Sequence, residues 1–147
     1  MANITRVTIT INASSQKVRG HLMNPDDLKH WLTGFVSVKP LTGTIGEAGS
    51  TSQLKFMEGG KEIEVIETVL LSNPNQQYSF RMESASFSSE NDIRLISLGD
   101  RTELIQTVQF QPKGFFMKLF IPFIKGAMKK RMHNELLKLK DLIESYP

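Results

Sequence analysis

The chain has 147 residues, of which 39% are hydrophobic and 22% are charged, proportions typical of one folded domain with a substantial core, here spanning residues 1–147. It contains no cysteine, which excludes disulfides, thiolate metal ligands and thiol nucleophiles. The first residues lack a basic segment followed by an apolar run, so we expect no secretion signal and no membrane span, and therefore a cytoplasmic protein.

The net charge of +3 is unevenly distributed. The segment from Lys113 to Glu135 contains six basic residues and no acidic residue before Glu135. The six are Lys113, Lys118, Lys125, Lys129, Lys130 and Arg131. Removing these six from the 18 basic residues leaves 12 against 15 acidic ones, so the rest of the chain is acidic. Because no aromatic residues alternate with basic ones on the predicted strands, we expect no binding to nucleic acid.

The predicted elements begin with a strand over residues 4–12, in which apolar and polar residues alternate. Hydroxyl residues follow where a helix N-cap is needed, so a short helix comes next. Asn24 and Pro25 separate it from a second short helix, which ends at Trp31. Two short helices are therefore expected directly after the first strand.

Six further strands are predicted after Gly34, over residues 35–41, 50–57, 61–71, 76–84, 87–98 and 101–111. Short turns such as Gly59-Gly60 separate them, so we expect the strands to pair in chain order as an antiparallel meander. The glycine-rich connection Gly43–Gly49 is followed by no helix and ends in no lysine-hydroxyl pair. It is therefore not a phosphate-binding loop.

Residues 113–146 are predicted to form one long C-terminal helix. At about 100° per residue, apolar residues such as Met128, Met132 and Leu136 share one side of it. Nearly everything before Lys113 is strand-like, so the simplest partner for this apolar side is a curved antiparallel sheet that wraps around the helix.

This order of elements resembles the START-like, or Bet v 1-like (SRPBCC), helix-grip superfamily, and most closely its polyketide cyclase/dehydrase-type branch of small bacterial proteins. The segments that carry the resemblance are Ile11–Val18, similar to the family's strand leading into a helix, and Asn24–Trp31, similar to its short second helix. The segment Gly43–Gly49 resembles its glycine-rich turn between strands two and three.

The resemblance implies an α+β helix-grip fold, in which a seven-stranded curved antiparallel sheet wraps a long C-terminal helix and leaves an apolar cavity between them. Members of the superfamily bind lipids, sterols, quinones, plant hormones or polyketides, and a minority catalyse cyclisation or dehydration. The resemblance therefore implies ligand binding more strongly than it implies a reaction.

Several polar residues are expected at the cavity. Arg131 and Glu135 are four residues apart within the apolar arc of the long helix. Either they pair with each other or reach solvent at the cavity mouth, or Arg131 presents its guanidinium to the polar end of a ligand. Strand alternation turns Glu67 and Gln106 inward. Glu67 is the one catalytic candidate, because an apolar cavity raises the pKa of a carboxyl group, although a one-residue bulge would turn it outward.

The expected lining residues are otherwise apolar, namely Met57, Phe80, Met82, Phe110, Phe120, Ile124 and Met128. Ordinary core packing explains each of them equally well. The histidines, His21, His30 and His133, lie on three different predicted helices and have no partner at metal-ligand spacing. We therefore expect them at the solvated surface, with no metal and no tightly bound cofactor in the protein.

The leading hypothesis is binding of a hydrophobic or amphipathic small molecule, similar to a lipid, quinone or polyketide, between the sheet and the long helix. The first rival is a metal-free enzyme of cyclase or dehydratase type that uses Glu67 or Arg131. The sequence favours binding over catalysis. It leaves open whether the protein is a monomer or a homodimer, and whether side chains fill the cavity.

The second rival is a lipid or quinone carrier that contacts membranes. In it, Phe115, Phe116 and Phe123 dip into an anionic bilayer surface while neighbouring lysines stay above. The apolar segment is too short to span a bilayer. The alternative is that these aromatic residues pack inside and close the sheet.

Overall fold

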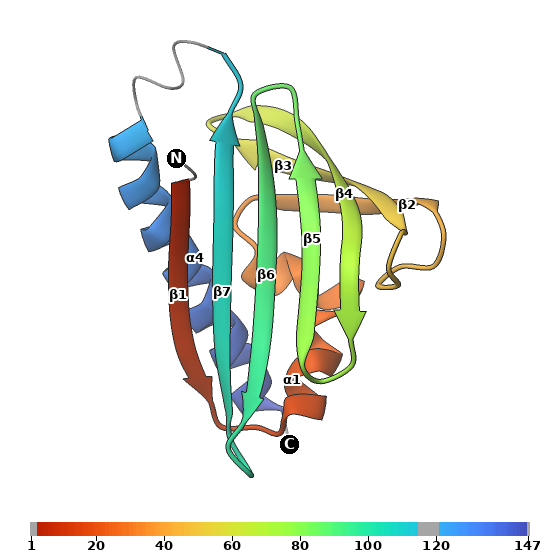
Figure 1. Ribbon diagram of the computed structural model, residues 1–147, viewed down its shortest axis with the longest axis vertical. Coiled ribbons are helices and arrows are strands. Elements are labelled where there is room, and N and C mark those ends of the chain that lie inside the picture. The colour runs from red at the N-terminus through yellow and green to blue at the C-terminus, as the bar shows by residue number, and fades with distance from the viewer. Residues whose placement is uncertain (1–2, 115–120, 147) are drawn as a thin grey trace.

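The computed structural model describes residues 3–114 and 121–146. Seven strands form one antiparallel sheet, and they are β1 (Asn3–Ile11), β2 (Phe35–Thr42), β3 (Thr51–Glu58), β4 (Lys61–Asn73), β5 (Gln77–Glu83), β6 (Phe87–Ser97) and β7 (Thr102–Pro112). The helices are α1 (Ser15–Leu22), the 3-10 turn η1 (Pro25–Asp27), α2 (Leu28–Trp31) and α4 (Ile121–Ser145). The predicted helix-grip fold is confirmed (Figure 1).

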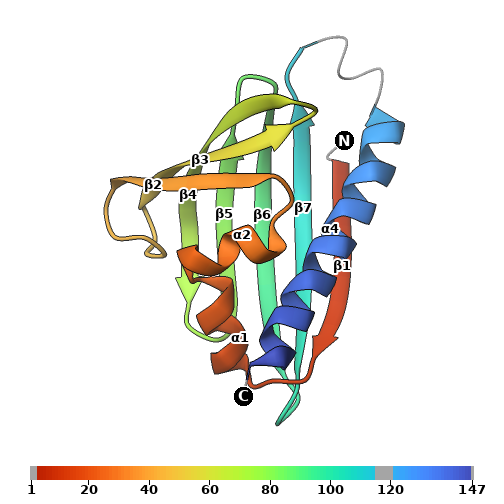
Figure 2. The ribbon, with the colours of Figure 1, turned by 180° about the vertical axis from the view of Figure 1, so that it is seen from behind.

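The strand order in the sheet is β1-β7-β6-β5-β4-β3-β2. The predicted pairing in chain order therefore holds from β2 to β7 and is wrong for β1, which pairs with β7 from Asn3 opposite Phe110 to Ile11 opposite Thr102. The chain between β1 and β2 forms the short helices, which lie on the same side of the sheet as α4 (Figure 2). This crossing places β1 and β2 at opposite edges of the sheet.

The long helix begins later than predicted. Gly114 has a φ of 97°, which no α-helix contains, and the Lys113 N–H donates to the Ser86 carbonyl at 2.8 Å. Both residues therefore belong to the end of the sheet and not to the long helix. Residues 115–120, which include Phe115, Phe116 and Phe120, lie outside the described residues. Among the described residues, no helix is both long and apolar enough to cross a bilayer.

The C-terminal half of α4 packs against the sheet without space between them. Leu136, Leu139 and Ile143 follow the 3.6-residue period and are all buried. They belong to one cluster with inward-facing residues of β1, β6 and β7, among them Leu104. This half of the helix therefore forms a closed hydrophobic core.

One histidine departs from the expectation of a solvated surface. The side chain of His21 is 17% exposed, and its Nδ1 lies 2.9 Å from Oδ2 of Asp27. The imidazole ring also packs on Tyr146, with 4.7 Å between the ring centroids. His21 therefore fastens α1 to the following turn and to the C-terminus, a contact that the sequence spacing did not reveal.

The end of α4 is fastened to the end of β1. The Asn12 N–H donates to Oε2 of Glu144 at 2.8 Å, and the Lys140 ammonium donates to the Thr10 carbonyl at 2.8 Å. The Asn12 amide, assisted by Lys140, holds the pKa of Glu144 below its usual value of 4.5. These contacts fix the register between the helix and the sheet edge.

We expect Glu144→Gln to lower the free energy of unfolding by about 1 kcal/mol at neutral pH, because a charged acceptor of the Asn12 N–H is lost. Since the pKa of Glu144 is lowered by folding, its contribution is present above the ordinary pKa and disappears as the pH falls through the folded value. Urea denaturation at neutral and at acidic pH measures the difference. The exposed Asp141→Asn is the control, and an equal loss for both variants would contradict the anchoring role.

Candidate ligand-binding cavity

A cavity of about 620 Å³ lies between the concave face of the sheet, the short helices and the N-terminal half of α4. Most of its wall is apolar, including Leu54, Val65, Phe80, Ile93, Val108 and Met128. The volume lies within the range of small-molecule pockets. The side chains of the described residues therefore leave the interior open rather than filled.

Regular alternation turns one row of side chains into the cavity. Ser52 on β3 lies opposite Glu67 on β4, which lies opposite Met82 on β5, and all three line the cavity. The bulge that could have turned Glu67 outward does exist in β4, but it lies between Val69 and Leu71. Glu67 therefore keeps the same orientation as Val69 and faces the cavity.

The environment of Glu67 changes its acidity. Burial among apolar groups raises the pKa of Glu67 from 4.5 to about 7, and hydrogen bonding with the Tyr78 side chain offsets part of that rise. Burial also raises the pKa of Tyr78, and the charge of Glu67 adds to this effect, whereas Arg19 on α1 opposes it. Near neutral pH, Glu67 is thus present both as the acid and as the carboxylate, which suits proton transfer.

Further polar groups lie on the inner face, on β6 and β7. Nδ2 of Asn91 donates to Oγ of Ser89 at 3.1 Å, and Gln106 lies opposite Ile93 on the neighbouring strand. We call Ser52, Glu67, Tyr78, Ser89, Asn91 and Gln106, which all line the cavity, the inner polar groups. They come from five consecutive strands, β3 to β7, whose other lining residues are mostly apolar.

Arg131 lies at the rim of the cavity, where its side chain is 37% exposed. Its guanidinium forms an ion pair with Glu58 at the end of β3, lies 3.4 Å from Oε2 of Glu135, and donates to the Thr33 carbonyl at 2.9 Å. Oε2 of Glu135 also accepts the Thr33 N–H at 2.8 Å. The geometry thus favours the first interpretation of Arg131 and Glu135, as a pair at the mouth, and adds Glu58 to it.

The cavity brings together most of the residues predicted to line it. Those in its wall are Arg131, Glu135, Gln106, Phe80, Met82, Phe110, Ile124 and Met128. The prediction that Met57 lines the cavity is wrong, because Met57 is 46% exposed on the outer face of β3. Phe56 and Glu58 face the cavity, so alternation turns Met57 away from it. Phe120 and the side chain of Phe123 lie outside the described part of the chain.

The sequence prediction missed several lining residues. Tyr78 shares its alternation with Phe80 and Met82, so this pattern could have identified it. Trp31 also lines the cavity, and its Nε1 is the one buried side-chain polar atom without a hydrogen-bond partner in the described residues. Glu58 precedes a hairpin turn, and nothing local in the sequence connects it with Arg131.

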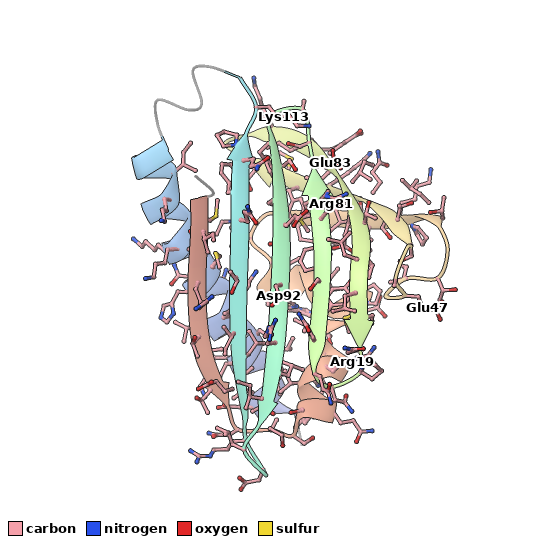
Figure 3. The ribbon with its side chains drawn as sticks, in the orientation of Figure 1. Arg19, Glu47, Arg81, Glu83, Asp92 and Lys113 are labelled. Atoms are coloured by element: carbon pink, nitrogen blue, oxygen red, sulfur yellow. The ribbon has the colours of Figure 1, made fainter. Side chains whose placement is uncertain are left out.

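The outer face of the sheet differs from this inner face. Figure 3 shows it, with Arg81, Glu83 and Asp92 on neighbouring strands. Arg81 pairs with Glu90 at 3.1 Å, and Oδ1 of Asp92 accepts a hydrogen bond from Ser79 at 2.6 Å. Charged residues on this outer face thus pair with neighbouring side chains at the surface, whereas few charged residues line the cavity. Within residues 3–114 and 121–146, no three histidine or acidic side chains gather as metal ligands would.

Comparison with protein families gives one match that covers nearly the whole chain. The family is described as polyketide cyclase / dehydrase and lipid transport, and the match spans residues 2–144. A search among curated proteins finds no match.

Solved structures show the same fold. An aromatase/cyclase, ZhuI, from Streptomyces sp. R1128 has a TM-score of 0.82 at 14% identity, over 98% of this chain and 94% of its own. A START superfamily protein from Mycobacterium smegmatis has a TM-score of 0.81 at 16% identity, over 98% and 99%. A protein from Thermus thermophilus has a TM-score of 0.80 at 18% identity, over 97% of each chain. At these identities the similarity concerns the fold.

Proposed function

Because the chain belongs to the polyketide cyclase / dehydrase and lipid-transport family, we propose that it binds one hydrophobic or amphipathic small molecule in the cavity between the sheet and α4. The observation that carries this proposal is the cavity of about 620 Å³, whose wall is apolar except for the inner polar groups and the rim. An apolar pocket with a few convergent polar groups is the usual form of a small-molecule site. Suitable ligands resemble a lipid, a quinone or a polyketide.

Native mass spectrometry of freshly purified protein tests this function. We expect a fraction of the protein to carry added mass above its 16.6 kDa chain, and this mass to be lost after denaturation. After refolding, the protein freed of its ligand is expected to bind the neutral probe Nile red. The function is wrong if the protein retains no added mass and the stripped protein fails to bind the probe.

A matched pair of variants on α4 locates the binding. Ala127 lines the cavity, so Ala127→Phe is expected to weaken Nile red binding at least about tenfold by filling part of the space. Lys129 lies about 200° further around the helix and is exposed. Lys129→Phe is therefore expected to leave binding unchanged. Equal binding by both variants would mean that the probe sits elsewhere.

Acid–base catalysis by Glu67 is a second candidate function, favoured by its raised pKa of about 7 inside a ligand-sized cavity. The corresponding reaction class is dehydration or cyclisation of a bound polyketide-like compound. Turnover of a β-hydroxyketone test compound that Glu67→Gln abolishes, with binding retained, would establish it. Membrane contact through Phe115, Phe116 and Phe123 stays a prediction, and co-sedimentation with anionic liposomes at low salt tests it.

A further inference from the structure

We infer that the cavity selects amphipathic ligands whose polar end donates hydrogen bonds without carrying negative charge, such as an amine or a hydroxyl, and that it rejects long-chain carboxylates. This selectivity rests on the proposed binding function. It follows from which charges line the cavity, which of them are already paired, and which hydrogen-bonding atoms are still available.

The charged residues in the described part of the lining are mostly acidic. They are the carboxyl groups of Glu58, Glu67 and Glu135 and the guanidinium of Arg131. Arg19 acts on Tyr78 from α1 but does not line this cavity. A ligand carboxylate would enter a space of low dielectric that already has an excess of negative charge, where like charges repel more strongly than in water.

Arg131, the cation of this lining, is already engaged. Its three nitrogens contact Glu58, Glu135 and the Thr33 carbonyl. These contacts use three of the five N–H donors of the guanidinium, but its single positive charge is already shared by two carboxylates, those of Glu58 and Glu135. A ligand carboxylate at Arg131 would add a third negative charge to this cluster, so Arg131 does not provide a free anion site.

The sheet wall presents the Glu67 carboxyl group to the cavity, while the one buried donor without a partner among the described residues, the neutral Nε1–H of Trp31, lies on α2. The Tyr78 hydroxyl is engaged with Glu67, and Nδ2 of Asn91 donates to Ser89. The Glu67 carboxylate accepts several hydrogen bonds and donates none when ionised. Ser52 and Gln106 either donate or accept, so they do not discriminate between head groups. An ammonium or hydroxyl group beside Glu67 would find an acceptor there, and a carboxylate would find a like charge.

Three probes with one chain length and different head groups test the selectivity, namely decylamine, decanol and decanoate, each below its micelle concentration. The protein has a single tryptophan, Trp31, and it lines the cavity, so its fluorescence reports ligand entry directly. At about pH 8.5 Glu67 is ionised, decylamine is cationic and decanoate is anionic. We expect decylamine and decanol to bind at least about tenfold more tightly than decanoate.

The variant Glu67→Gln removes the charge while keeping the size of the side chain. We expect it to tighten decanoate binding and weaken decylamine binding, each by about fivefold or more. Glu83 on β5 is exposed on the outer face (Figure 3), so Glu83→Gln is the matched control and is expected to change neither affinity. Circular dichroism of both variants is the check that they are folded.

The outcomes separate this inference from the function on which it rests. Tight binding of decanoate, equal to or stronger than that of decanol, would overturn the selectivity and leave ligand binding intact. A preference against decanoate that persists unchanged in Glu67→Gln would also overturn it. Failure of all three probes to bind, together with no retained mass in the native protein, would overturn the binding function itself.

Discussion

Glu67→Gln is expected to stabilise the protein by up to about 3 kcal/mol at about pH 8.5, and to change its stability little at about pH 4. Burial raises the pKa of Glu67 from 4.5 to about 7, so between these values the folded protein binds more protons than the unfolded chain. The free energy of unfolding therefore falls as the pH rises through this window. Glutamine has no charge to bury and avoids that loss.

Thermal unfolding at acidic, intermediate and alkaline pH measures this effect. For a chain of this size, about 3 kcal/mol corresponds to a rise in Tm of roughly 10 °C, which should appear only on the alkaline side. The outer-face variant Glu83→Gln should show no such dependence. A stabilisation of the same size at every pH would mean that packing, rather than the buried charge, causes it.

A side chain that costs stability in this way is a feature of functional sites more than of ordinary cores. Glu67 lies on the wall of a ligand-sized cavity beside Tyr78, and burial makes its ionisation unfavourable. A ligand that donates a hydrogen bond or a positive charge to Glu67 would reduce this cost. Binding and stability are therefore coupled at one carboxyl group.

Leu136→Ala is expected to lower the free energy of unfolding by about 4 kcal/mol, and Met132→Ala by about 2 kcal/mol. The two residues are one turn apart on α4 and both are buried. Leu136 lies in the closed core, so its removal leaves an empty hole. Met132 lines the cavity, so its removal enlarges a space that already exists, and the cost of an isolated hole does not arise.

Urea denaturation of both variants measures this difference, and native mass spectrometry adds a second measurement. We expect Met132→Ala to retain ligand and to accept bulkier probes than the wild type, while Leu136→Ala shows no gain in probe size. Equal losses of stability would mean that the hole at Leu136 is as open to solvent as the one at Met132. The pair therefore maps where the core ends and the cavity begins.

Local patterns in the sequence predicted most of the fold. Alternation identified the strands, and the 3.6-residue period identified the face of α4 that packs on them, with Met132 and Leu136 among its buried residues. The pairing of β1 with β7 was missed because it joins segments from opposite ends of the chain. Sequence periodicity identifies a strand and its buried face, but it does not predict which distant strand pairs with it.

The same limit applies to the cavity. The inward orientation of Glu67 followed from alternation, because the bulge in β4 comes after it. The pairing of Arg131 with Glu135 followed from helical spacing. By contrast, Glu58 reaches Arg131 only through the folded arrangement of β3 and α4. Met57 was assigned to the wrong face because the apolar character of a side chain does not fix its strand parity.

The position of β1 at the sheet edge beside β7 has a consequence for synthesis of the protein. Strand β1 is made before its hydrogen-bonding partner, residues 102–112, which follows roughly a hundred residues later. Until these residues emerge, the apolar face of β1 has no strand beside it, and it is exposed to chaperones and to other nascent chains. Pairing between such distant segments is slow, so the sheet edge is completed only after β7 has been made, and α4, which contacts β1, follows it in the chain.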